Sequence, residues 1–107
     1  MHTSEAEKER TEALASIRAE IDRIDAEVIS LLGQRANYVQ QAGHYKPSAA
    51  RVRVPERERQ VIARACQLAT EHGLDPSFVE QLYLMMLDYF VKYEQEHVRR
   101  RIELSDK

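Results

Sequence analysis

The fold of this chain is decided by residues 14–35, which read LASIRAEIDRIDAEVISLLGQR. Apolar residues recur in this stretch in alternating steps of three and four, which places them on one face of a helix. These residues are Leu14, Ile17, Ile21, Ile24, Val28 and Leu31. The pattern continues outward over about residues 5–45. The helix is expected to end there, because Pro47 restricts Lys46 to non-helical backbone angles.

Two further helices are expected after this one. The second opens at Pro55, a residue suited to the first helical turn, and stops at Gly73, a residue typical of a helix C-terminus. The third opens with Asp75 as its N-cap and Pro76 behind it, and its apolar stripe reaches His97. No segment alternates apolar and polar residues for long enough to indicate a strand. We therefore predict an all-α fold of three helices, the first very long.

The first helix is too long for one chain of this size to cover. Thirty-odd helical residues span roughly 45–55 Å, whereas a compact chain of this length has a radius of gyration of about 13 Å. Because another surface must bury the apolar stripe, we predict an intertwined homodimer, since twofold dimers are the commonest oligomers. The alternative is a single helix that projects from a small body and leaves Ile17, Ile21 and Ile24 in water.

Length and composition limit the remaining possibilities. The chain has 107 residues and a formal net charge of −2, which predicts one domain over residues 1–107, with residues 1–12 frayed or partly ordered. This charge favours neither nucleic acid nor an anionic membrane, and no apolar run has the length of a membrane span. Cys66 is the only cysteine and the histidines lack metal-site spacing, so we expect neither a disulfide nor a metal. Without a signal-peptide core, the protein is expected to be cytoplasmic.

Two cations follow the apolar face of the first helix. Arg35 occupies the next seven-residue step after Val28, and a buried guanidinium is costly unless it is paired. Lys46 lies eleven residues further on, about three helical turns, and so on roughly the same side. An anion between the two cations would relieve their repulsion. The alternative is an internal salt bridge from Arg35 to Glu58 or Asp88.

Glu94 lies on the apolar side of the third helix, four residues after Phe90 and seven after Leu87. Removing a carboxyl group from water favours its neutral, proton-donating form. We therefore expect Glu94 to be partly desolvated and able to donate a proton. The alternative is an exposed glutamate near His97 or Arg101.

Three more charges are candidates for a binding site. Arg57 and Glu58 fall in the first turn of the second helix, in step with its apolar positions. The alternatives are a surface arginine and an acid that complements the helix dipole. Arg18 lies some 25 Å along the first helix from Arg35, so the two meet only if Arg18 of one chain reaches Arg35 of the other. The alternative for Arg18 is a solvated side chain at the edge of the stripe.

Several segments of the chain form a recognisable frame. Residues 17–25 read IRAEIDRID, residues 31–35 read LLGQR, Lys46 follows, and residues 55–59 read PERER. Together with LDPSFV at residues 74–79, this frame resembles the all-helical chorismate mutase family over about residues 14–98. The resemblance implies an intertwined dimer of three-helix chains. It also implies a small cyclic dicarboxylate as the substrate, and no metal or cofactor.

The resemblance also implies a role for each candidate residue in the rearrangement of chorismate to prephenate. Arg18 would enter the partner's site and hold one substrate carboxylate, and Arg35 would hold the other. Lys46 would bond the ether oxygen of the breaking bond and a carboxylate, and Glu94 would donate to the same oxygen. The remaining roles would fall to Arg57 as a further cation, Glu58 as the acceptor from the ring hydroxyl, and Leu87 and Phe90 as the apolar wall.

Some features of the chain point to related activities. The run Lys46-Pro47-Ser48 and the short loop after it look closer to the isochorismate pyruvate lyases, which release salicylate and pyruvate. Val54 also stands where many mutases carry an acid, whereas Glu58 is typical of the mutases. We therefore place mutase activity first and lyase activity second. A 4-amino-4-deoxychorismate mutase or a non-enzymatic helical dimer comes after these.

Overall fold

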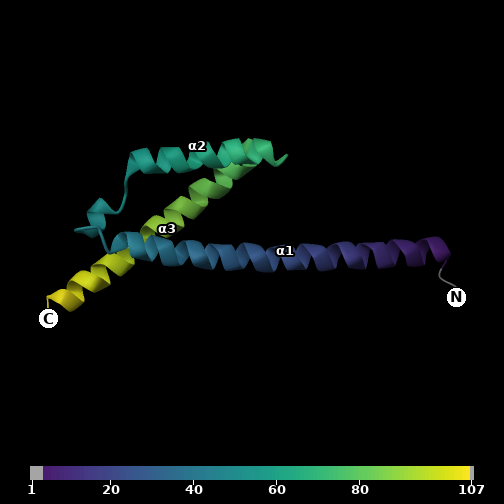
Figure 1. Ribbon diagram of the computed structural model, residues 1–107, viewed down its shortest axis with the longest axis horizontal. Helices are drawn as coiled ribbons and strands as arrows, with labels where there is room; N and C mark the ends of the chain where they lie inside the picture. Colours follow the sequence, from purple (N-terminus) through teal and green to yellow (C-terminus); the bar gives the residue numbers. More distant parts are fainter. Residues whose placement is uncertain (1–3, 107) are drawn as a thin grey trace. The chain divides into compact units, whose positions relative to one another are not determined.

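The computed structural model describes residues 4–106, and within that range every regular element is helical (Figure 1). The long helix α1 spans Glu5–Gly43 and is followed by the short 3-10 helix η1 at Ala49–Arg51. The helices α2 and α3 span Pro55–Glu71 and Pro76–Ser105. The all-α class and the three long helices are thus confirmed. The short helix η1 is an addition that the sequence pattern did not indicate.

Local chemistry sets the connection between α2 and α3. Pro55 begins α2, as predicted. After α2, Gly73 adopts a left-handed φ of 72°, and the amide of Leu74 donates to the carbonyl of Ala69 at 2.8 Å. The side chain of Asp75 then accepts a hydrogen bond from the amide of Ser77 at 2.9 Å and caps α3.

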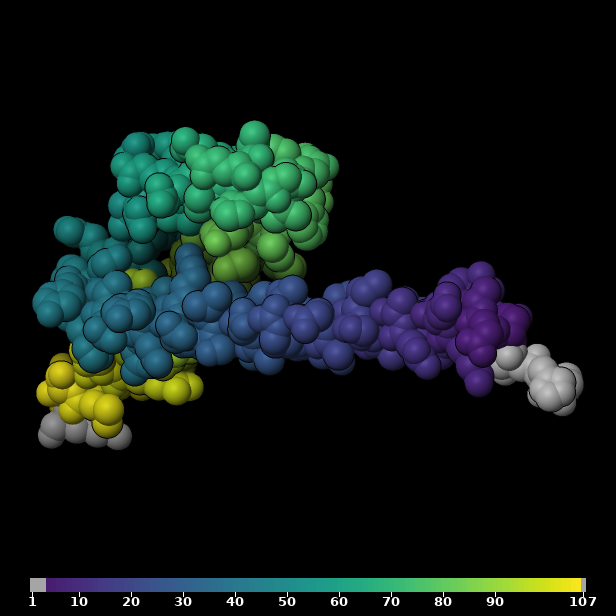
Figure 2. Space-filling model, turned by 45° about the vertical axis from the view of Figure 1, so that its right-hand side comes forward, coloured from purple at the N-terminus to yellow at the C-terminus, as the bar shows by residue number. Residues whose placement is uncertain are grey.

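The chain divides into two compact units, residues 1–35 and residues 36–107. The structure describes residues 4–35 of the first unit. These residues are almost entirely the N-terminal part of α1 and form a single helix (purple to blue in Figure 2). Because one helix cannot bury its own side chains, the predicted stripe lies on the surface: Leu14, Ile17 and Ile21 are 44%, 56% and 50% exposed. The periodicity predicted the helix correctly. The burial of its apolar stripe by a second copy of the chain remains a prediction.

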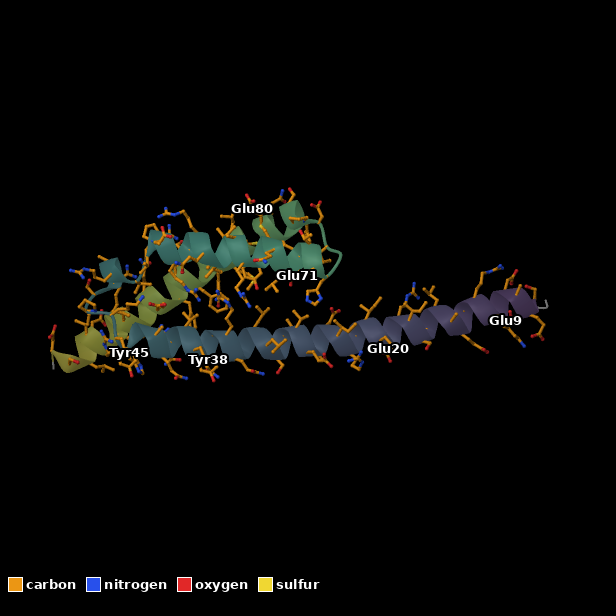
Figure 3. All side chains as sticks on the ribbon, turned by 45° about the horizontal axis from the view of Figure 1, so that its top comes forward. Glu9, Glu20, Tyr38, Tyr45, Glu71 and Glu80 are labelled. Carbon is orange, nitrogen blue, oxygen red and sulfur yellow. The ribbon has the colours of Figure 1, made fainter. Side chains whose placement is uncertain are left out.

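Charged side chains cover much of α1 and help to hold it helical. Arg23 donates to Glu20 at 2.8 Å and to Glu27 at 2.7 Å, spacings at which side chains meet on one helix face. Figure 3 labels Glu9 and Glu20 along this helix. Between residues 4 and 106, no helix combines the length and the apolar character that a membrane crossing requires.

The second unit holds the end of α1 together with η1, α2 and α3, and α2 packs against α3 near the turn that joins them (Figure 1). Its small apolar cluster consists of Ala65 and Ala69 from α2 and Val79 from α3, with Tyr83 against them. Further along α3 the buried side of the helix continues, and η1 packs on this helix. The buried residues of that side are Leu87, Phe90, Glu94 and Val98.

Candidate functional site

The site candidates of the second unit begin where α1 ends. Three successive amides, those of His44, Tyr45 and Lys46, donate to carbonyls three residues earlier, each at 3.1 Å, and tighten the last turn. Tyr45, labelled in Figure 3, is 89% exposed. Lys46 is half-buried, and its ammonium donates to the carbonyl of Val52 at 3.4 Å. The tightened turn therefore gives adjacent side chains opposite environments.

Gly43, the last residue of α1, is buried against α3. A Cβ atom at this position would lie 3.1 Å from Cγ of Glu94 and 3.3 Å from Cγ2 of Val98. Both distances are tighter than ordinary van der Waals contact, so a larger residue would force the side chains of Glu94 and Val98 to shift. The glycine thus allows the backbone before Lys46 to approach the helix that carries Glu94.

Lys46 and Glu94 form the central pair of the site. The Nζ atom of Lys46 lies 3.3 Å from Oε2 of Glu94, and the Glu94 residue is only 8% exposed. The same Oε2 atom is fully buried and makes no hydrogen bond to any group in residues 4–106, so its contact with the ammonium is an ion pair. The exposed alternative for Glu94 is therefore wrong. A buried carboxylate oxygen beside an ammonium is a polar centre that a ligand can engage.

The apolar wall proposed next to this centre also lies on α3. Leu87 and Phe90 are each 8% exposed and share the buried side of the helix with Glu94. The ring of Phe90 makes edge contacts with Tyr89 and Tyr93, with centroids 5.2 Å and 6.0 Å apart. This aromatic packing fixes the Phe90 ring on the buried side of α3.

Glu58 lies in the first turn of α2, where it meets an arginine that the sequence analysis did not single out. The Nε atom of Arg53 lies 3.6 Å from Oε2 of Glu58, and Nη2 of Arg53 lies 3.8 Å from Oδ1 of Asp88. Arg53 thus pairs with both acids that had been alternative partners for Arg35. Its position just before Pro55, where the chain enters α2, is the one sequence feature that could have suggested this role. Arg57 is exposed on the same turn.

Arg101 is the second residue that the sequence analysis missed as part of the site. It was considered only as a possible neighbour of an exposed Glu94. In the structure its guanidinium donates from Nη1 to the carbonyl of Gly43 at 2.8 Å and from Nη2 to the carbonyl of Lys46 at 2.5 Å. Arg101 therefore connects α3 to the backbone that carries Lys46.

The eight predicted site residues are divided between the two units. Arg18, which is exposed, and Arg35, which is half-buried, belong to the first unit. The second unit contains Lys46, Arg57, Glu58, Leu87, Phe90 and Glu94. Of these six, Lys46 and Glu94 are in direct contact, and Leu87 and Phe90 share the buried side of α3 with Glu94. The convergence of Arg18 and Arg35 on this pair remains a prediction. Within residues 4–106, no three metal-ligating side chains of His, Cys, Asp or Glu come together.

Comparisons with known proteins agree on one protein family. A family profile described as chorismate mutase type II matches residues 17–95. The chain is 36% identical over 87 residues to an isochorismate pyruvate lyase from Pseudomonas aeruginosa, which covers 81% of this chain and 86% of that protein. It is 30% identical over 89 residues to a 4-amino-4-deoxychorismate mutase from Streptomyces pristinaespiralis, which covers 82% of this chain and 69% of that protein.

A more distant relative has the activity that the resemblance put first. A chorismate mutase from Methanocaldococcus jannaschii is 24% identical over 88 residues, which cover 81% of this chain and 89% of that protein. These three relatives are all enzymes, two mutases and one lyase. The profile spans most of the chain, including Lys46 and Glu94. The chain therefore belongs to the chorismate mutase type II family.

Proposed function

We propose that this chain rearranges chorismate to prephenate in a single pericyclic step. The observation that carries the proposal is the buried pair of Lys46 and Glu94, whose Nζ and Oε2 atoms are 3.3 Å apart. A pericyclic rearrangement requires no nucleophile and no cofactor. It gains instead from hydrogen-bond donors held where charge develops in the transition state. Lys46 and a protonated Glu94 would both donate to the ether oxygen of the breaking bond.

Binding the substrate is a problem of holding two carboxylates. Chorismate is a dianion, and a guanidinium matches a carboxylate with two parallel hydrogen bonds. In this proposal Arg18 and Arg35 each hold one carboxylate, and Arg57 adds a further cation at the N-terminus of α2. Holding both groups selects the compact conformer in which the reacting atoms approach each other. Leu87 and Phe90 supply an apolar wall for the ring.

The proposal requires Glu94 to carry a proton when the substrate is bound. Without a substrate, the Lys46 ammonium faces the Glu94 carboxylate at 3.3 Å. A bound dianion would draw the ammonium toward its own oxygens and bring further negative charge close to a carboxylate that is 8% exposed. In this proposal the dianion takes the ammonium as its partner, and Glu94 acts beside it as a neutral hydrogen-bond donor.

The proposal also includes a homodimer. The stripe residues Ile17, Ile21 and Ile24 are 47–56% exposed on a unit whose described part consists almost entirely of one helix. A second copy presents the same stripe, which suits a twofold interface that is complementary to itself. In such a dimer Arg18 of one chain would complete the site that contains Lys46 of the other.

The lyase reaction is the second candidate. It is favoured by the 36% identity to an isochorismate pyruvate lyase and by the Lys46-Pro47-Ser48 run. Glu58 argues for the mutase, because a glutamate at this position is typical of the mutases that the chain resembles, and its half-buried carboxylate can accept a hydrogen bond from the ring hydroxyl of chorismate. The 30% identity to a 4-amino-4-deoxychorismate mutase makes that reaction the third candidate.

One assay separates these reactions. The purified chain is offered chorismate, isochorismate and 4-amino-4-deoxychorismate, and kcat/KM is measured for each. The mutase proposal expects the highest kcat/KM with chorismate and prephenate as its product. Salicylate from isochorismate with little prephenate from chorismate would establish the lyase instead. Turnover of none of the three would leave a non-enzymatic helical dimer.

A further inference from the structure

Arg101 has contacts that the proposed reaction does not explain. It lies in α3 seven residues after Glu94, about two helical turns, and its side chain is half-buried. Its guanidinium donates hydrogen bonds to two backbone carbonyls of one short segment, those of Gly43 and Lys46. An arginine that only complemented the helix dipole would face the carbonyls at the end of its own helix. This one instead reaches a segment 55–58 residues away in sequence.

The two carbonyls mark the ends of one turn. The amide of Lys46 donates to the carbonyl of Gly43 at 3.1 Å, and the same carbonyl accepts from Arg101. The second arm of the fork binds the carbonyl of Lys46 itself. A planar guanidinium with two arms fixes both the position and the orientation of such a turn, which a single ammonium cannot do.

Gly43 adds a second constraint on the same turn. Because a Cβ atom at Gly43 would lie 3.1 Å from Cγ of Glu94, the turn is seated directly on the residue that Lys46 faces. Glu94 and Arg101 lie about two helical turns apart on α3, and both contact this turn. The stem of Lys46 begins at this turn, and its ammonium ends 3.3 Å from Glu94.

We infer that Arg101 is a positioning residue for Lys46, acting through the backbone carbonyls of Gly43 and Lys46. This inference rests on the proposed function for its catalytic consequence, whereas the clamp itself is a property of the ligand-free chain. A displacement of about 1 Å in a catalytic group can cost up to about a hundredfold in rate. Loss of the fork therefore lowers kcat, although Arg101 does not itself touch the substrate.

The test compares Arg101→Ala with Arg100→Ala as a matched control. Arg100 is the preceding residue and carries the same charge, but its side chain pairs with Glu96 on its own helix, at 3.2 Å. We expect Arg101→Ala to lower kcat by about 10- to 100-fold, while Arg100→Ala leaves it within about twofold. Arg101→Lys keeps the charge without the fork and recovers only part of the loss. Circular dichroism checks that each variant is folded.

Two measurements separate positioning from a general structural effect. Adding Arg101→Ala to Lys46→Ala costs no further activity, because the clamp acts only through Lys46. In the ligand-free chain, hydrogen exchange at the amide of Lys46 becomes about tenfold faster in Arg101→Ala, while amides in the middle of α2 keep their rates.

The possible results are distinguishable. Unchanged exchange at Lys46 overturns the clamp, and an equal loss of kcat in Arg100→Ala or a further loss in the Lys46→Ala background overturns positioning. A wild-type chain that turns over none of the three substrates refutes the proposed function. The exchange measurement then decides the clamp alone.

Discussion

The two units of the chain differ in the burial of the helix face that follows the apolar pattern. In the first unit the apolar stripe is exposed, with Ile17 and Ile21 at 56% and 50%. In the second unit the buried side of α3 includes a charged residue, Glu94, at 8%. Apolar groups in water and a carboxyl out of water are both costly, and each cost needs a compensation.

The compensations differ in where they come from. In the second unit the compensation for buried Glu94 comes from residues 36–107 themselves. The Lys46 ammonium pairs with the carboxylate, and Gly43 and Arg101 hold the turn that carries Lys46. The first unit contains no such partner among residues 4–35. The polar centre is therefore complete within one unit, whereas the apolar face has no cover from its own unit, as the proposed dimer requires.

Placing a charge on the exposed stripe should have the largest effect. We expect Ile21→Asp to abolish the dimer and all activity, because twofold symmetry would bury the new carboxylate twice at the interface. Ala19→Asp adds the same charge about 160° away around the helix and serves as the control. Light scattering and the chorismate assay make the comparison. A fully active Ile21→Asp monomer would contradict the dimer.

Complementation between chains tests whether each site combines both units. Arg18→Ala and Lys46→Ala should each lose about 10²- to 10³-fold in kcat/KM, because Lys46 is a transition-state donor and Arg18 holds a substrate carboxylate. If Arg18 serves the partner's site, each mixed dimer has one intact site. Unfolding and refolding the two variants together should then restore activity in about a quarter of all sites.

The control is each variant refolded alone, which should stay inactive. Recovery to well above the sum of the two separate activities supports a site shared between chains. A mixture no more active than that sum would show that Arg18 does not serve the partner's site.

Features set by neighbouring residues were predicted well from the sequence. Pro55, Gly73 and Asp75 mark helix ends through their own backbone or side-chain chemistry, and the structure confirms all three positions. Periodicity also predicted the burial of Glu94, because its spacing from Leu87 and Phe90 fixes its side of α3.

Contacts between distant segments were not predictable in the same way. Arg101 reaches carbonyls 55–58 residues earlier, and Arg53 joins acids from two different helices. Both contacts depend on the path of the loop after α1, which no periodic pattern encodes. The helix η1 was missed for the same reason, because a three-residue turn reflects its packing on α3 more than its own propensity.

The pH dependence sharpens the account of the buried pair. If Glu94 must be protonated to donate, raising the pH removes that proton, so kcat/KM with chorismate should fall as the pH rises. Glu94→Gln keeps a donor that does not titrate and should flatten the profile. Rates of both proteins across pH 5–9, with circular dichroism at each end, make the test. A decline that persists unchanged in Glu94→Gln would show that Glu94 does not cause the pH dependence.

The smallest effect is expected at Arg53, which ties the loop before α2 to α3. Its contacts with Glu58 and Asp88 are long, at 3.6 Å and 3.8 Å, and its side chain is 49% exposed, so the pairs contribute little to stability. Arg53→Ala should therefore leave the melting temperature nearly unchanged. It should raise KM for chorismate a few-fold, because Glu58 then loses the cation that orients it toward the ring hydroxyl.

Asp88→Asn is the matched variant for this last prediction, since it removes the other acid and leaves Arg53 with Glu58. Asp88→Asn should keep the wild-type KM for chorismate if Arg53 acts by orienting Glu58. If both variants raise KM equally, Arg53 acts by fixing the loop to α3, and Glu58 gains nothing specific from it. The loop as a whole would then hold Glu58, in contrast to Lys46, whose turn Arg101 binds directly at two carbonyls.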